Sequence, residues 1–123
     1  MTTPLERLIH DPRTHRVGIE DVPFFMKGPR QMLFISGDPK LRPEAQDVAV
    51  VVRELTKGHE DIDVGWLAPE DEPEARKVLA LRKIPCVIFA ANGAELHRIE
   101  GMRDWEVYAQ AMAEFLGRKE TFK

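Results

Sequence analysis

The chain has very little cysteine: Cys86 is the only one among its 123 residues. A single thiol excludes a disulfide within the chain. It also excludes disulfide exchange of the two-cysteine kind, in which a second thiol resolves the mixed disulfide. Histidine is scarce as well, and the four histidines show no paired spacing such as i, i+4: they are His10, His15, His59 and His97. Because these residues offer no convincing set of metal ligands, we expect no metal and no other cofactor.

The sequence also lacks a basic excess, long apolar runs and the motifs of several enzyme classes. Its formal net charge is -3, whereas a protein that binds nucleic acid usually presents a basic face. The longest apolar runs, such as Met32–Ile35 and Cys86–Ala91, are far shorter than the ~20 residues that span a bilayer. No glycine-rich phosphate loop is present, and Ser36 is the only serine, with nothing that marks an adjacent base. No hydrophobic signal region follows Met1, so we expect a cytoplasmic protein without membrane insertion.

Hydrophobic periodicity predicts alternating strands and helices within one domain, residues 1–123, whose core runs from about 15 to 117. The expected strands are 17–19, 31–35, 62–66, 86–91 and 96–99. The expected helices are 5–9, 21–26, 44–57, 74–81 and 105–116, the last one capped by Asp104. Without the first helix this order is β-α-β-α-β-α-β-β-α. It predicts an α/β sandwich of three layers, with a central mixed sheet and helices on both faces.

The dipeptide Ile84-Pro85 stands directly before the apolar run Cys86–Ala91, and Asn92-Gly93 follows that run. Proline cannot donate to a central ladder, so it belongs at the start of a strand or at a bend. Asn-Gly between apolar runs predicts a two-residue hairpin turn. A proline that leads into an antiparallel hairpin after an α/β stretch resembles the cis-proline loop of thioredoxin-like domains. We therefore expect a thioredoxin-like fold with a cis Pro85.

A more specific resemblance lies in three short segments. Leu33–Lys40, which reads LFISGDPK, is followed by Pro43-Glu44, and both are similar to the HyaE/HupG family of hydrogenase-expression proteins, as is Gly101–Trp105. The resemblance implies a cytoplasmic chaperone or accessory protein for nickel-iron hydrogenase maturation that lacks the CxxC dithiol. It also implies the partner, which is the hydrogenase small-subunit precursor with its twin-arginine signal peptide. Other maturation proteins are further candidate partners.

The loop around Pro85 is the first candidate surface for binding that partner. If Pro85 is cis, the backbone of Ile84 is exposed beside Ser36, Gly37 and Asp38, and an extended peptide can pair with it as in strand addition. The alternative is a cis-proline that serves the architecture alone.

Two acidic clusters are the second candidate. One consists of Glu70, Asp71, Glu72 and Glu74, and the other of Glu60, Asp61 and Asp63. A run of like charge is usually a solvated edge, but an acidic surface also attracts a basic segment such as a twin-arginine signal.

Cys86 and the aromatic residues admit alternative interpretations. A strand position favours Cys86 as a buried, slowly reacting side chain, while a single-thiol redox centre is the competing hypothesis. We assign to the core Trp66 and the stripe of the last helix, which consists of Trp105, Tyr108, Met112, Phe115 and Leu116. The sequence thus predicts a non-catalytic accessory protein, not an enzyme. A single-thiol redox protein and a structural subunit of a maturation complex remain the alternatives.

Overall fold

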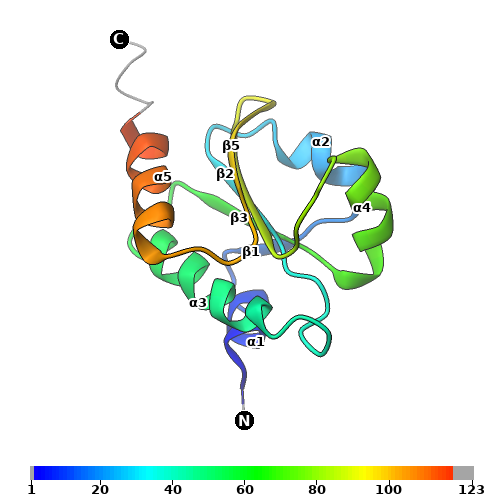
Figure 1. Cartoon of the computed structure of the whole chain (residues 1–123). Helices are drawn as coiled ribbons and strands as arrows, with labels where there is room; N and C mark the ends of the chain where they lie inside the picture. The colour runs from blue at the N-terminus through cyan, green and yellow to red at the C-terminus, as the bar shows by residue number, and fades with distance from the viewer. Residues whose placement is uncertain (1, 118–123) are drawn as a thin grey trace.

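The computed structural model describes residues 2–117 and contains one five-stranded sheet in the order β1-β3-β2-β4-β5 (Figure 1). The strands are β1 Thr14–Arg16, β2 Gln31–Ile35, β3 Asp63–Leu67, β4 Cys86–Ala91 and β5 Ala94–Glu100. The helices are α1 Pro4–Ile9, α2 Val22–Phe25, α3 Glu44–Thr56, α4 Glu72–Val78 and α5 Trp105–Gly117, with 3-10 turns η1 Ile19–Asp21 and η2 Pro69–Asp71.

The sheet is mixed, as the sequence predicts. Strands β1, β3 and β2 are parallel, whereas β4 is antiparallel to both β2 and β5. The turn between β4 and β5 consists of Asn92 and Gly93, which both have positive φ angles, 55° and 87°. Positive φ at both positions is what a tight hairpin turn needs, because its twist then matches that of the two strands.

Helices cover both faces of the sheet, so the predicted three-layer sandwich is confirmed. Figure 1 shows α1, α3 and α5 on one side and α2 and α4 on the other. The alternation along β2 explains how one strand serves both layers: Met32 and Phe34 pack into the cluster under α3 and α5, and Leu33 and Ile35 into the cluster under α4. All five residues of β2 are buried, as expected for a central strand.

The first strand was predicted at the wrong place. It covers Thr14–Arg16 rather than residues 17–19, since Val17 only completes the ladder by donating to the Trp66 carbonyl at 2.9 Å, and Ile19 already begins η1. Strand β1 is short, polar and at the edge of the sheet, so it carries no apolar signal.

The ends of α4 also differ from the prediction. This helix begins at Glu72 because Pro73 fits the first turn, where its missing N–H would have no partner anyway. It ends at Val78, and Ala80 then adopts a φ of 54°.

The aromatic core is confirmed except at one position. Trp66, Tyr108, Met112 and Phe115 are buried, and Leu116 packs at the margin of the same cluster. Trp105 was assigned to the core but is 50% exposed, because it is the first residue of α5 and the buried face of this helix begins only at Tyr108. Within residues 2–117, no helix combines the length and the apolar character that crossing a membrane requires.

Candidate functional site

Ser36 directly follows the central strand β2 and begins the loop that leads to α3. Its side chain is fully buried, and its hydroxyl donates to the Gly37 carbonyl at 2.9 Å and accepts from Trp66 Nε1 at 2.9 Å. The hydroxyl is thus engaged in both directions, as donor and as acceptor. This serine holds the indole of β3 in place and is not presented to solvent as a nucleophile.

Gly37 brings this loop against the Ile84-Pro85 segment. Its φ is +70°, and a Cβ on this residue would lie 2.9 Å from Ile84 Cγ2 and 3.1 Å from Arg42 Cδ. The next residue, Asp38, closes the loop, since its carboxylate accepts from the Lys40 amide at 2.9 Å. The structure therefore brings Gly37 against Ile84. The sequence predicted an exposed backbone at Ile84, but this residue is largely buried, at 8% exposure.

The Ile84-Pro85 peptide bond is cis, as expected, and a third loop joins it. The Pro85 carbonyl accepts from the Gly101 amide at 2.7 Å, so the β5–α5 loop lies directly against Pro85. Among the described residues, no backbone oxygen accepts from the Ile84 amide. A hollow of about 430 Å³ lies between the three loops, and we call it the proline hollow. It is lined by Arg42, Glu44, Arg76, Lys83, Ile84, Pro85, Glu100, Gly101, Met102 and Arg103.

The acidic residues Glu70 and Glu72 are both paired with arginines, but only Arg42, a partner of Glu72, belongs to these loops. Glu70 pairs with Arg16, whose guanidinium lies 5.5 Å from the centre of the Trp66 ring. Glu72 accepts from Arg42 Nη1 at 3.1 Å and from Arg76 Nε at 3.3 Å. Two of the four carboxylates in this cluster are thus paired with arginines, whereas Asp71 and Glu74 form no ion pair within residues 2–117.

Cys86 begins β4, directly after Pro85, and its side chain is fully buried. Burial raises the pKa of the thiol to about 12, although Arg98 acts in the opposite direction. A thiol with such a pKa carries almost no thiolate near neutral pH, and the thiolate is the reactive form. The site therefore resembles a structural cysteine more than a redox centre.

An ion network that the sequence analysis did not find supports the segment before Pro85. Arg98 donates to Glu95 at 2.6 Å, to Glu100 at 3.3 Å and to the Leu79 carbonyl at 2.9 Å. The Arg82 amide donates to the Glu100 carboxylate at 3.1 Å, and this bond, together with Arg98, lowers the pKa of Glu100. The spacing of these charges along β5 is the only signal in the sequence, and its partners on the α4–β4 segment appear only in the fold.

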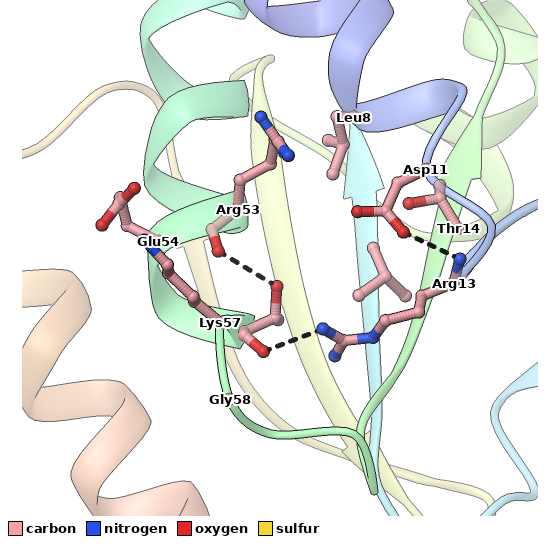
Figure 2. A pocket seen from close by; sticks show the side chains of 10 residues that line it. Leu8, Asp11, Arg13, Thr14, Arg53, Glu54, Lys57 and Gly58 are labelled. Atoms are coloured by element: carbon pink, nitrogen blue, oxygen red, sulfur yellow. Dashed lines mark hydrogen bonds between the residues drawn. The ribbon is translucent and has the colours of Figure 1, made fainter.

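A smaller hollow of about 220 Å³ lies at the C-terminal end of α3 (Figure 2). Arg13 crosses it and donates to the Thr56 carbonyl at 3.1 Å and the His59 carbonyl at 2.7 Å. These bonds satisfy carbonyls at the C-terminus of the helix, which is a structural role. Across residues 2–117, no three His, Cys, Asp or Glu side chains gather in a way that could hold a metal ion.

Comparison with known proteins gives a consistent picture. A family model described as "Hydrogenase-1 expression protein HyaE" matches residues 5–108. The chain is 32% identical over 110 residues to the hydrogenase expression/formation protein HoxO of Cupriavidus necator, covering 86% of this chain and 68% of that protein. It is 34% identical over 88 residues to HupG of Bradyrhizobium diazoefficiens, covering 71% of this chain and 60% of that protein. The chain therefore spans about three fifths to two thirds of the length of these relatives.

Among solved structures, the fold is similar to thioredoxins. A mutant thioredoxin from Halobacterium salinarum superposes with a TM-score of 0.69 at 15% identity, covering 85% of this chain and 93% of that one. Mitochondrial thioredoxin 3 from Saccharomyces cerevisiae gives a TM-score of 0.67 at 9% identity, covering 82% and 94%. At such low identity the likeness concerns the fold alone, which is thioredoxin-like as predicted.

Proposed function

Because the chain belongs to the HyaE family of hydrogenase expression proteins, we propose that it is a non-catalytic accessory protein of nickel-iron hydrogenase maturation. In this proposal it acts in the cytoplasm as a chaperone that binds the hydrogenase small-subunit precursor. Part of the affinity comes from the twin-arginine signal peptide. Binding delays export until the cofactors of the subunit are in place.

The observation that carries this proposal is a peptide-sized site without a thiol. Ser36, Gly37 and Asp38 occupy the loop after β2 and do not line the proline hollow, and the hydroxyl of Ser36 is buried and bonded as donor and acceptor. Ile84 is largely buried, at 8% exposure, but it lines the proline hollow and its amide donates to no backbone oxygen of residues 2–117, which leaves this donor for an extended chain. Such a site can bind a segment of a protein, and it has no group that exchanges disulfides.

The competing function, a redox protein that uses Cys86, needs an accessible thiolate. The side chain of Cys86 is fully buried and its pKa is raised to about 12, which disfavours that chemistry. A structural subunit of a maturation complex differs from our proposal in one respect: it would leave the proline hollow unused.

Surface capture with three ligands tests the proposal: the small-subunit precursor, the mature subunit and the isolated signal peptide. We expect the precursor to bind more tightly than the mature subunit, and the signal peptide to bind weakly by itself. Equal affinity for precursor and mature subunit would remove the role of the signal peptide. Absence of binding to every form would refute the proposed function.

The proline hollow is best blocked at Met102, which lines it and is 52% exposed. A bulky residue at Gly37 would clash with Ile84 at 2.9 Å, and Ser36 is buried, so substitutions there disturb the loop itself. We expect Met102→Trp to weaken precursor binding by filling the hollow. Val78→Trp on α4 is the matched control, since Val78 is 58% exposed and does not line the hollow. Equal binding by both variants would favour the structural-subunit alternative.

The acidic contribution is tested at two carboxylates of the cluster that do not bind an arginine of the proline hollow. Glu70 and Asp71 are suited to substitution because Glu72 also holds Arg42 and Arg76. We expect Glu70→Lys with Asp71→Lys to weaken capture of the signal peptide and to remove its dependence on salt. Glu54→Lys on the exposed face of α3 is the control and should change neither the capture of the signal peptide nor its dependence on salt.

A further inference from the structure

The charge of the proline hollow is opposite to that of the molecule. The chain as a whole carries a formal charge of -3. The residues that line the hollow nevertheless include four cations, Arg42, Arg76, Lys83 and Arg103, against two carboxylates, Glu44 and Glu100. A concave site of one sign raises the local concentration of ligand groups of the other sign. The hollow is therefore suited to an anionic group rather than to a pair of arginines.

Two of these cations are left without an acidic partner. Arg42 and Arg76 share Glu72, and Glu100 is engaged by Arg82 and Arg98. Lys83 and Arg103 form no ion pair with any carboxylate of residues 2–117. Glu44 is the one opposing charge without a pair, and it lies in the first turn of α3, where the helix dipole already stabilises it.

Lys83 and Arg103 both lie near Gly101. The stem of Lys83 passes Gly101, with Cδ 3.5 Å from the place of a Cβ there, and Arg103 Nε donates to the Glu100 carbonyl at 3.2 Å. Gly101 in turn donates to the Pro85 carbonyl, and both cations line the same hollow as Ile84, whose amide has no backbone acceptor within residues 2–117. A chain that pairs with Ile84 would thus carry its side chains past two unpaired cations.

We propose that the proline hollow selects an extended segment of the partner protein that carries a carboxylate side chain, with Lys83 and Arg103 as the residues that determine this specificity. The inference rests on the proposed function and adds to it. The twin-arginine pair is kept out of the hollow by like charge and binds outside it. Both cations are exposed, so each contributes a modest share of the affinity. A protein segment fits better than a small anion, because Met102 adds an exposed apolar edge and Ile84 offers backbone pairing.

The first test uses defined peptides and the full chain labelled with nitrogen-15. Three acetylated decapeptides alternate Thr with Glu, with Gln or with Lys, and sodium acetate serves as the small-anion arm. We expect the Glu peptide to shift the amide signals of Ile84, Gly101 and Met102, with a Kd about fivefold lower than that of the Gln peptide. The Lys peptide should leave these signals in place, and acetate should do so at equal carboxylate concentration. Equal affinity for the Glu and Gln peptides, or no shift with either, would overturn the inference, and a shift with acetate alone would reassign the hollow to small anions.

The second test uses the precursor with charge-reversed variants. Lys83→Glu with Arg103→Glu should reduce precursor affinity by about fivefold to tenfold. The matched control is Arg53→Glu with Lys57→Glu, an exposed Arg and Lys pair at the opposite end of α3, which should bind as the unaltered protein does. Equal precursor binding by both double variants would overturn the inference and leave the proposed function intact. Failure of the unaltered protein to bind the precursor would refute the proposed function, whatever the peptides show.

Discussion

At the scale of single residues, the side chains at the ends of the central strands are buried. They therefore cannot carry out the thiol exchange that a thioredoxin-like loop suggests. Ser36 directly follows β2, and Cys86, which begins β4, pairs in register with the last residue of β2, Ile35. Neither side chain reaches solvent. The sequence predicted the burial of Cys86 from its strand position, whereas the bond between Ser36 and Trp66 joins two strands and has no signature in either one alone.

We predict that Cys86 reacts slowly in the folded protein. With a thiol pKa of about 12, alkylation by iodoacetamide at pH 8 should be at least about a thousandfold slower than in the unfolded chain. The rate can be followed by mass spectrometry with and without urea. A rate in the folded protein similar to that of free cysteine would contradict the structural role of this thiol.

We predict that the Ser36 hydroxyl stabilises the fold through Trp66. Ser36→Ala should lower the free energy of unfolding by about 2 kcal/mol, because it leaves the buried indole N–H without an acceptor. In a Trp66→Phe background the same substitution should cost less than about 1 kcal/mol, since no donor is left unpaired. Urea denaturation of the four proteins measures this coupling. An equal cost in both backgrounds would show that the bond contributes nothing.

At the scale of the elements, the strongly patterned segments were predicted well and the weakly patterned ones were not. Strand β2 matches the predicted 31–35 because five consecutive buried residues leave one interpretation, and the hairpin follows from Asn92-Gly93. Strand β1 was misplaced, since its pairing with β3 is a long-range contact between polar residues and Val64–Trp66. The local sequence pattern does not indicate such a contact.

The loop geometry at Gly37 predicts that an alanine at this position destabilises the fold more than an alanine at Gly58. Gly37 and Gly58 both have positive φ, +70° and +82°, but a Cβ at Gly58 meets no atom within 4 Å. Gly58→Ala should therefore lower the free energy of unfolding by about 1 kcal/mol, through backbone strain alone. Gly37→Ala should lower it by at least about 1 kcal/mol more, because the added Cβ clashes with Ile84. Thermal and urea unfolding of the two variants measure the difference. Equal costs would mean that the Gly37 and Ile84 loops are not in contact.

The Arg98 network predicts a dependence of stability on pH. The folded-state pKa of Glu100 is lowered, mainly by the Arg82 amide, so its stabilising effect is present above the unfolded-state pKa and is lost as the pH falls through the folded-state pKa. Glu100→Gln should lower the free energy of unfolding by about 1 kcal/mol at pH 7, and the difference should shrink below about pH 4. Glu54→Gln on exposed α3 is the control and should show no such trend. A difference that is constant from pH 3 to 7 would contradict the ionised role of Glu100.

At the scale of the whole molecule, the fold and the family could be predicted from the sequence, while the electrostatics of the site could not. The three loops that meet at Pro85 come from positions far apart in the chain. Their cations lie in the loop before α3, on α4 and beyond both ends of the β4–β5 hairpin. As a result, the acidic clusters looked like the dominant charge in the sequence, although Glu70 and Glu72 are paired with arginines in the fold. The fold thus combines a basic hollow at Pro85 with a more acidic surface beyond it.

The most direct test of the account measures whether precursor binding is independent of the thiol. Cys86→Ala should lower the free energy of unfolding by about 1 kcal/mol through lost burial. It should nevertheless bind the small-subunit precursor with the affinity of the unaltered protein, under reducing and oxidising conditions alike. Calorimetric titration of both proteins with the precursor provides this comparison. Loss of binding in a folded Cys86→Ala protein, or a dependence of the affinity on redox conditions, would contradict the central claim that this chain binds its partner without thiol chemistry.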